Sequence, residues 1–128
     1  MSWAAVLDAA SEADRPPLLV GVTVLTSISE RIFREELRCA GTVADQVVHL
    51  ARLCQSTGLD GVVCSPHEVA TIHRICGPDF VTVVPGVRPA GVAAHDQARV
   101  ATPGDAVRNG ARHLVVGRAI TAAPDPAA

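Results

Sequence analysis

The most informative absence in this sequence is lysine, since all eleven basic residues are arginine. Tyrosine is also absent and aromatic residues make up only 2% of the chain, which argues against an aromatic platform for single-stranded nucleic acid. The net charge of -2 argues against duplex nucleic acid or an anionic membrane surface, because either partner requires a basic face. We therefore expect neither nucleic acid nor membrane as a partner.

Long apolar runs and closely spaced cysteines are missing as well. The longest apolar run, residues 16–25, is interrupted by Gly21 and Thr23 and is too short to cross a bilayer. The first eight residues lack the basic start of a secretory signal, so we expect a cytoplasmic protein. The four cysteines form no Cys-x-x-Cys pair, which argues against a zinc or redox site and predicts reduced, mostly buried thiols.

What the chain does have is apolar residues in alternating short and long segments. With 48% hydrophobic residues it can bury a core, as one domain or as part of a larger one. Hydrophobic periodicity and capping signals predict four strands and four helices. The predicted strands are residues 18–24, 61–64, 80–84 and 114–116. The predicted helices are residues 2–12, 42–58, 65–77 and 102–110.

Two stretches do not fit this alternation. Residues 31–38 form a short polar segment, and residues 89–101 show no strong periodicity. A loop of the second length in a compact domain is usually functional or mobile.

The order of elements predicts an α/β fold. Strands that alternate with helices form parallel sheets with right-handed crossovers. The pattern fits a small doubly wound sheet, and it fits half of an eight-stranded barrel equally well.

Polar groups follow each of the four predicted strands: Thr26 and Ser27, Ser65, Arg88, and Gly117 with Arg118. Because the carboxyl ends of parallel strands meet at one edge of the sheet, these groups should converge on one ligand. Arg88 and Arg118 can each make forked, charge-assisted contacts to phosphate oxygens, and the backbone amides near Gly117 add neutral donors. The sequence therefore predicts a phosphate site at this edge.

Other polar residues carry weaker hypotheses. Gln97 can donate and accept hydrogen bonds at once, which suits a residue that closes over a ligand. His95 and Asp96 suggest a catalytic dyad, but no neighbour supplies a nucleophile or a second base. The remaining helical histidines are expected to be solvated on helix faces: His49, His67 and His73.

Five blocks of sequence together resemble one family. They are residues 18–27 (LLVGVTVLTS), 58–65 (GLDGVVCS), 85–89 (PGVRP), 96–97 with 102–103 (DQ and TP), and 116–121 (VGRAIT). In order and spacing they resemble the carboxyl half of bacterial orotidine 5'-phosphate decarboxylases, from about Ala4 to the last residue. The resemblance implies that residues 1–128 form a single partial domain, half of a (β/α)8 TIM-type barrel containing strands 5 to 8.

The resemblance also implies an activity and a site. The family removes carbon dioxide from orotidine monophosphate (OMP) to give UMP, works without metal or organic cofactor, and acts as a homodimer. Carried over by position, Thr26 would line the pyrimidine pocket, with Ser27 a weaker candidate beside it. The implied nucleotide contacts are Arg88, Gln97 on a closing loop, and Gly117 with Arg118 at the phosphate.

The chain departs from the family pattern in one large respect. Small departures occur at Val84, Val87 and Ala119, none of which removes an implied ligand contact. The family's catalytic lysine, set among aspartates in a D-x-K-x-x-D segment, has no counterpart, because the chain contains no lysine. The resemblance therefore implies a binding half that is inactive alone, with a homodimer or complementation by an amino-terminal half as the expected partner.

Two other functions stay open. The half barrel could be a non-catalytic module that holds phosphate or a nucleotide. A related barrel enzyme acting on a sugar phosphate is a third reading, and the pyrimidine-side Thr26 and Ser27 argue against it.

Overall fold

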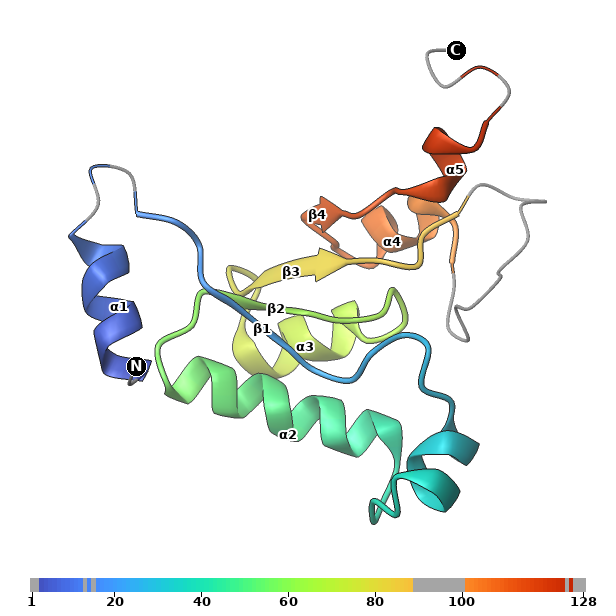
Figure 1. Ribbon diagram of the computed structural model, residues 1–128, viewed down its shortest axis with the longest axis horizontal. Helices are drawn as coiled ribbons and strands as arrows, with labels where there is room; N and C mark the ends of the chain where they lie inside the picture. Colours follow the sequence, from blue (N-terminus) through green and yellow to red (C-terminus); the bar gives the residue numbers. More distant parts are fainter. Residues whose placement is uncertain (1–2, 13, 15, 89–100, 124, 126–128) are drawn as a thin grey trace.

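The computed structural model describes residues 3–12, 14, 16–88, 101–123 and 125. Four parallel strands form one sheet in the order β1-β2-β3-β4 (Figure 1), which confirms the predicted α/β class. Their bounds are β1 Val20–Val22, β2 Gly61–Val63, β3 Val81–Val84 and β4 His113–Leu114. The observed strands are shorter than predicted, and β4 begins one residue earlier than the expected 114–116, because His113 pairs with Val83.

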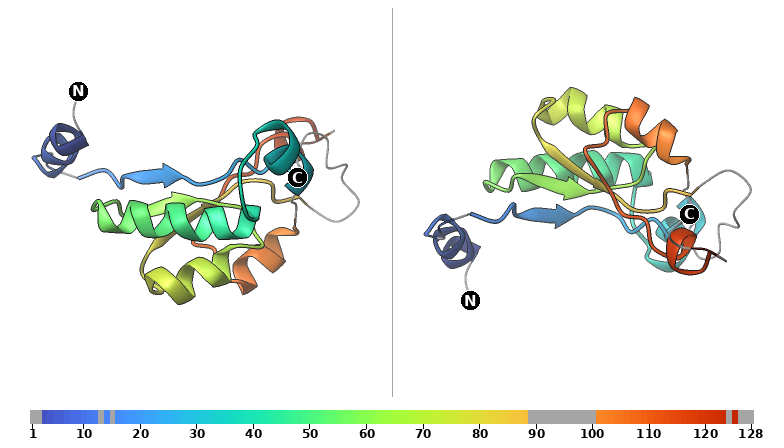
Figure 2. Two further views of the ribbon diagram at one scale, coloured as in Figure 1. Left: turned by 90° about the horizontal axis from the view of Figure 1, so that it is seen from below. Right: turned by 90° about the horizontal axis from the view of Figure 1, so that it is seen from above.

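Helices lie mainly on one side of this sheet. They are α1 Trp3–Ser11, α2 Val43–Ser56, α3 Val69–Cys76, α4 Pro103–Arg108 and the short α5 Arg118–Thr121. Helices α2, α3 and α4 pack on the same side of the strands, whereas α1 stands apart from them (Figures 1 and 2). Within the described residues, no helix combines the length and the apolar character needed to span a bilayer.

The strand register decides which side chains meet the helices. Val62 lies opposite Gly21 on β1 and Thr82 on β3. Val62 and Thr82 are fully buried under the helices, as is Val84 two residues further along β3. Since side chains alternate along a strand, the residues between them point to the opposite side. That side, here named the valine face, carries Val22, Val63, Val83 and Val115.

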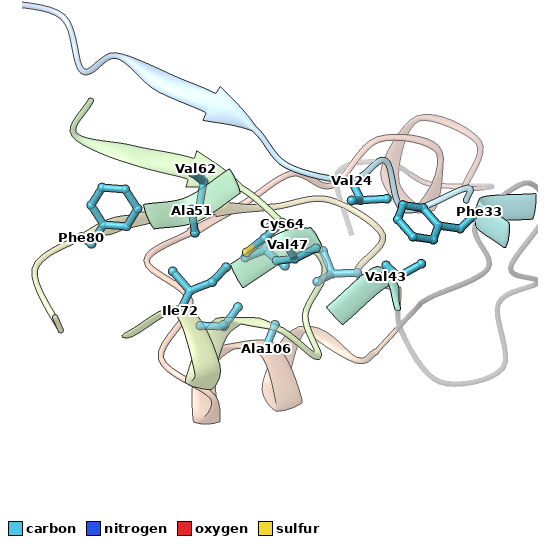
Figure 3. Packing of buried hydrophobic residues seen from close by; sticks show 13 residues of the cluster. Val24, Phe33, Val43, Val47, Ala51, Val62, Cys64, Ile72, Phe80 and Ala106 are labelled. Atoms are coloured by element: carbon cyan, nitrogen blue, oxygen red, sulfur yellow. The ribbon is translucent and has the colours of Figure 1, made fainter. Parts of the chain in front are cut away.

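The core is built from the helix side of the sheet (Figure 3). Helix α2 contributes Val47 and Ala51, and α3 contributes Ile72, all at most 1% exposed. The hydrophobic periodicity that predicts both helices thus corresponds to their buried faces. The other buried apolar residues of this cluster are Val24, Phe33, Val43, Val62, Cys64, Val69, Phe80, Val84, Val87 and Ala106.

Residues 31–38 are more than the polar segment that we expected. They contain the π-helix η1 Ile32–Glu36, in which Phe33 is only 3% exposed. Phe33 packs into the core beside Val24 and Val43 (Figure 3), which anchors the segment despite its charge. Its charged side chains pair on the outside, as in the 2.9 Å contact of Arg31 with Glu36.

The sequence predicts capping motifs at Thr42, Ser65 and Thr102, and two of the three are confirmed. The Thr42 hydroxyl accepts a hydrogen bond from Asp45 N at 3.1 Å, and Thr102 does the same for Asp105 N at 3.1 Å. At residues 65–68 only half of the expected box forms, because the Ser65 hydroxyl has no partner. Glu68 N bonds instead to the Ser65 carbonyl, which closes a turn and delays α3 to Val69.

At the amino ends of the strands, Asp60 holds three strands in place. Its carboxylate accepts a hydrogen bond from Leu19 N at 2.7 Å, and its own N–H donates to the Leu19 carbonyl at 2.9 Å. Its carbonyl accepts from Val81 N at 2.9 Å. The starts of β1, β2 and β3 are thus aligned through one residue.

The four cysteines are free thiols, and their burial only partly matches expectation. Cys64 is buried, Cys54 and Cys76 are partly buried, and Cys39 is exposed. Burial raises the pKa of the Cys54 and Cys76 thiols, which keeps them protonated near neutrality. No group of three or more His, Cys, Asp or Glu side chains suited to a metal ion occurs in the described part of the chain.

Replacing Val47 by alanine should destabilise the fold by about 2 kcal/mol or more, because two buried methyl groups are lost and a cavity remains. The matched control is Val107→Ala, also in a helix but 58% exposed. Denaturant unfolding followed by circular dichroism should show a change within about 0.5 kcal/mol for that control. Equal losses for the two variants would contradict the described core.

The pH dependence of stability should involve Asp105. The Thr102 hydroxyl, and then Arg108, hold the pKa of this carboxyl below its usual value. Since the folded-state pKa is lowered, this stabilisation is present above the ordinary carboxyl pKa of about 4 and is lost as pH falls. Thr102→Ala should flatten the acid limb of an unfolding-against-pH curve, whereas Thr102→Ser should retain it.

Candidate functional site

Two neighbouring pockets lie at the carboxyl ends of the strands. The first, of about 160 Å³, is here named the arginine pocket, and its lining residues are Pro85, Gly86, Val87, Arg88, Val115, Gly117, Arg118 and Ala119. The second, of about 240 Å³, is the threonine pocket, lined by Val22, Val24, Leu25, Thr26, Ser27, Val63, Cys64 and Pro85. Pro85 lines both, so the two pockets adjoin.

The chain beyond β3 positions Arg88. Gly86 turns the backbone with a positive φ of 74°, a conformation that favours glycine. Val87 then pairs with Ala101 in a parallel bridge, and Arg88 N donates to the Ala101 carbonyl at 3.0 Å. The Arg88 Nε atom is buried without a hydrogen-bond partner among the described residues. A buried guanidinium N–H without a partner can donate a charge-assisted hydrogen bond to an anionic ligand.

The chain beyond β4 forms the opposite wall of the arginine pocket. Val115 N donates to the Val84 carbonyl at 2.9 Å, which ties this wall to β3. Gly117 precedes α5, and its carbonyl accepts from Ile120 N at 2.8 Å. A Cβ added at Gly117 would meet no atom within 4 Å. The space beside the Gly117 backbone is therefore open to a ligand.

The charged side chains that line the arginine pocket are positive. Arg88 and Arg118 both line it, and no carboxylate is among its described lining residues. Two guanidinium groups can together hold a phosphate through forked, charge-assisted hydrogen bonds.

The threonine pocket has a different character. Thr26 is 7% exposed and Ser27 is exposed, just beyond β1, where Ile28 N closes a turn onto the Leu25 carbonyl at 2.9 Å. Val22 and Val63 contribute apolar walls from the valine face. Hydroxyls on an apolar, uncharged wall suit a neutral ring that carries carbonyl and N–H groups.

Most of the predicted site residues come together. Arg88, Gly117 and Arg118 line one pocket, while Thr26 and Ser27 line the adjoining one. Gln97 lies outside the described residues, as do His95 and Asp96.

Two polar residues do not behave as expected. Ser65 was expected to face the ligand, but it is fully buried and lines neither pocket, because its backbone is bent into the turn closed by Glu68. His49 and His67 are exposed as expected, whereas the Nε2 atom of His73 is buried without a partner. The other ring nitrogen lies close to Gly110, where an added Cβ would be 2.9 Å from His73 Nδ1.

Sequence reasoning missed several lining residues. Pro85 and Gly86 follow β3 directly, and Cys64 follows β2. The signal that could have identified these three residues is their position immediately after a predicted strand. They were missed because only polar side chains were expected to line the site. Val22 and Val63 had no such signal, because their exposure depends on which side of the sheet the helices cover.

The combined geometry suits binding more than chemistry. A ligand with a phosphate at one end and a neutral ring at the other can occupy both pockets across Pro85. The described lining residues include neither a carboxylate nor a lysine or histidine.

Comparison with known proteins gives a consistent family. The model of the orotidine 5'-phosphate decarboxylase / HUMPS family matches residues 2–128. The orotidine 5'-phosphate decarboxylase of Moorella thermoacetica is 52% identical over 126 residues, which are 98% of this chain and 50% of that protein. That of Heliobacterium modesticaldum is 50% identical over 111 residues, 87% of this chain and 46% of that protein.

Solved structures agree with these relatives. The orotidine 5'-phosphate decarboxylase of Lactobacillus acidophilus superposes with a TM-score of 0.72 at 43% identity, covering 90% of this chain and 46% of that one. An uncharacterised conserved protein from Geobacillus kaustophilus superposes with a TM-score of 0.74 at 37% identity, covering 97% and 52%. The chain thus spans about half the length of the relatives that it matches. It belongs to the orotidine 5'-phosphate decarboxylase / HUMPS family.

Proposed function

We propose that this chain is the substrate-binding half of an orotidine 5'-phosphate decarboxylase, which converts OMP to UMP and carbon dioxide. The observation that carries the proposal is the pair of adjoining pockets that share Pro85, one cationic and one apolar with hydroxyls. In this proposal residues 1–128 are one partial domain, strands 5 to 8 of a (β/α)8 barrel. The match to half the length of each relative supports it.

The residues take separate roles in holding the nucleotide. Arg88 and Arg118 bind the phosphate, and Gly117 leaves room for the phosphate beside the backbone. Thr26 recognises the pyrimidine, with Ser27 beside it. The resemblance adds Gln97 as a further contact.

The proton that replaces carbon dioxide must come from elsewhere. Protonation of the ring carbon needs an acid, and this chain has no lysine. We therefore propose that the chain alone is inactive and that it associates as a homodimer or with an amino-terminal half. Of these two partners, only an amino-terminal half that carries the lysine and aspartates can supply the missing acid. The proposed reaction uses no metal or organic cofactor.

A second candidate is a non-catalytic module that holds a phosphate or nucleotide. The absence of a carboxylate, lysine or histidine among the described lining residues favours it. Both candidates bind UMP, and only the decarboxylase half contributes to turnover when a complementing half is present.

Calorimetric titration of UMP should detect binding that Arg118→Ala weakens by roughly 10- to 100-fold, since one charge-assisted contact is lost. The matched control is Arg52→Ala, an exposed arginine on α2 that lines neither pocket. Gly117→Ala should lower UMP affinity without changing the unfolding free energy by more than about 0.5 kcal/mol. If Arg52→Ala weakens binding as much as Arg118→Ala, the phosphate assignment is wrong.

Release of carbon dioxide from carboxyl-labelled OMP should be undetectable with the chain alone. Adding an amino-terminal half of the Moorella relative should restore turnover, because that half brings a proton donor to the bound ring. The Arg118→Ala chain should then give a much lower kcat/KM than the Arg52→Ala chain in the same mixture. UMP binding without any turnover in the mixture would favour the non-catalytic module.

A further inference from the structure

Thr26, the residue proposed to recognise the pyrimidine, lies on a segment that has already left the sheet. Strand β1 ends at Val22, and Thr26 comes only after three further residues. The Thr26 side chain is 7% exposed and lines the threonine pocket. Its position relative to the other walls of that pocket therefore depends on how the backbone beyond β1 is anchored.

Thr23, the first residue after β1, supplies an anchor through two hydrogen bonds to one acceptor. Its backbone N–H donates to the Val63 carbonyl at 3.2 Å, and its hydroxyl Oγ1 donates to the same oxygen at 2.9 Å. The amide bond continues the pairing of β1 with β2 but is at the long end of the usual range, whereas the hydroxyl bond lies within it. The hydroxyl thus reinforces the attachment where the backbone bond alone is long.

The surroundings of Thr23 keep its hydroxyl on this acceptor. Thr23 is 9% exposed, so water has little access to replace the Val63 carbonyl as its partner. A buried hydroxyl that loses its acceptor still bears the cost of its desolvation. Threonine is also β-branched, which restricts its χ1 angle. The side chain is therefore kept in the orientation that reaches the Val63 carbonyl.

The acceptor belongs to another wall of the same pocket. Val63 is the last residue of β2 and lines the threonine pocket, as does Cys64 after it. Cys64 N donates to the Val83 carbonyl at 3.1 Å, which fixes this wall to β3. The Thr23 hydroxyl therefore connects the segment that carries Thr26 to the β2 wall, while Thr23 itself lines neither pocket.

The rest of the segment is anchored on both sides of Thr26. Val24 is 7% exposed and packs in the core beside Phe33 (Figure 3). The turn at residues 25–28 is closed by a backbone hydrogen bond of 2.9 Å. A short segment held in this way has little freedom to absorb a change at Thr23, so a shift there moves Thr26 relative to β2.

We propose that Thr23 is a positioning residue for pyrimidine recognition. It acts through the Val63 carbonyl, which keeps Thr26 at a fixed separation from the β2 wall and so sets the width of the space that accepts the ring. Arg88 and Arg118 lie beyond β3 and β4, so Thr23 affects recognition of the base and not of the phosphate. The inference rests on the proposed function, in which Thr26 recognises the pyrimidine.

Thr82 on β3 offers a matched control. It is also a buried threonine of the sheet, 0% exposed, but its hydroxyl has no hydrogen-bond partner among the described residues. Replacing either threonine by valine removes a buried hydroxyl and keeps the shape of the side chain. Only at Thr23 does the replacement also remove a hydrogen bond, so the comparison isolates the bond to Val63.

Calorimetric titrations with UMP and with ribose 5-phosphate separate recognition of the base from recognition of the phosphate. Thr23→Val should weaken UMP binding by about 3- to 10-fold, as expected for one buried hydrogen bond, and should change ribose 5-phosphate binding by less than about twofold. Thr23→Ser and Thr82→Val should each stay within about twofold of the unchanged chain for UMP. Thr23→Cys, a weaker donor of similar size, should fall between the serine and valine variants. Circular dichroism should show the same helix content throughout.

A double-mutant cycle tests whether Thr23 acts through Thr26. Thr26→Ala removes the hydroxyl that Thr23 positions, so adding Thr23→Val to it should weaken UMP binding by less than about a further twofold. Equal losses for UMP and ribose 5-phosphate, or a full additional loss in the double variant, would show a merely structural role and overturn the inference. UMP binding that Thr23→Val leaves unchanged would overturn it as well. Failure of the unchanged chain to bind UMP is a distinct result, which would overturn the proposed function and this inference with it.

Discussion

The close approach of β2 to β3 is the contact on which the rest of the molecule depends. Gly61 lies so near Val81 that an added Cβ would be 2.1 Å from the Val81 carbonyl oxygen. This approach aligns the two central strands, with Val62 beside Thr82 and Val63 beside Val83. It therefore brings the ends of both strands level, so that Cys64 and Pro85 line the same pocket. The adjoining pockets follow from backbone packing at the opposite ends of the strands.

The site separates recognition of charge from recognition of shape. The arginine pocket is built by the chain beyond β3 and β4, and the threonine pocket mainly by the chain beyond β1. The backbone at Arg88 is held by the bridge between Val87 and Ala101, so little backbone entropy is lost there when an anion binds. In the proposed function, the described residues form a preformed nucleotide site, and the groups that act on the nucleotide come from another chain segment.

Much of this arrangement could be predicted from the sequence because it depends on local signals. Apolar runs in the sequence indicate all four strands, and Thr42 and Thr102 indicate where two helices begin. The rule that polar residues follow the ends of strands singled out Arg88 and Arg118. The errors arose where tertiary contacts outweigh local preference. Phe33 anchors a charged segment by long-range packing, the Ser65 turn overrides a capping pattern, and His73 lies close to Gly110. No local pattern indicates which side of a sheet stays open, so the exposure of Val22 could not be predicted.

The hydrogen bonds at Asp60 have a consequence for the order of folding. In the continuous stretch from α2 to β3, α2 contacts β2 and α3, and β2 contacts β3, so this stretch can form early at low entropic cost. Strand β1 joins this unit through Asp60 and Leu19, which are 41 residues apart in the chain. Closing that long loop is slower than forming the local contacts, and it is rewarded only after β2 is in place to receive the strand. We therefore expect the segment from α2 to β3 to form before β1 docks, so that the threonine pocket is completed only once β1 has joined β2.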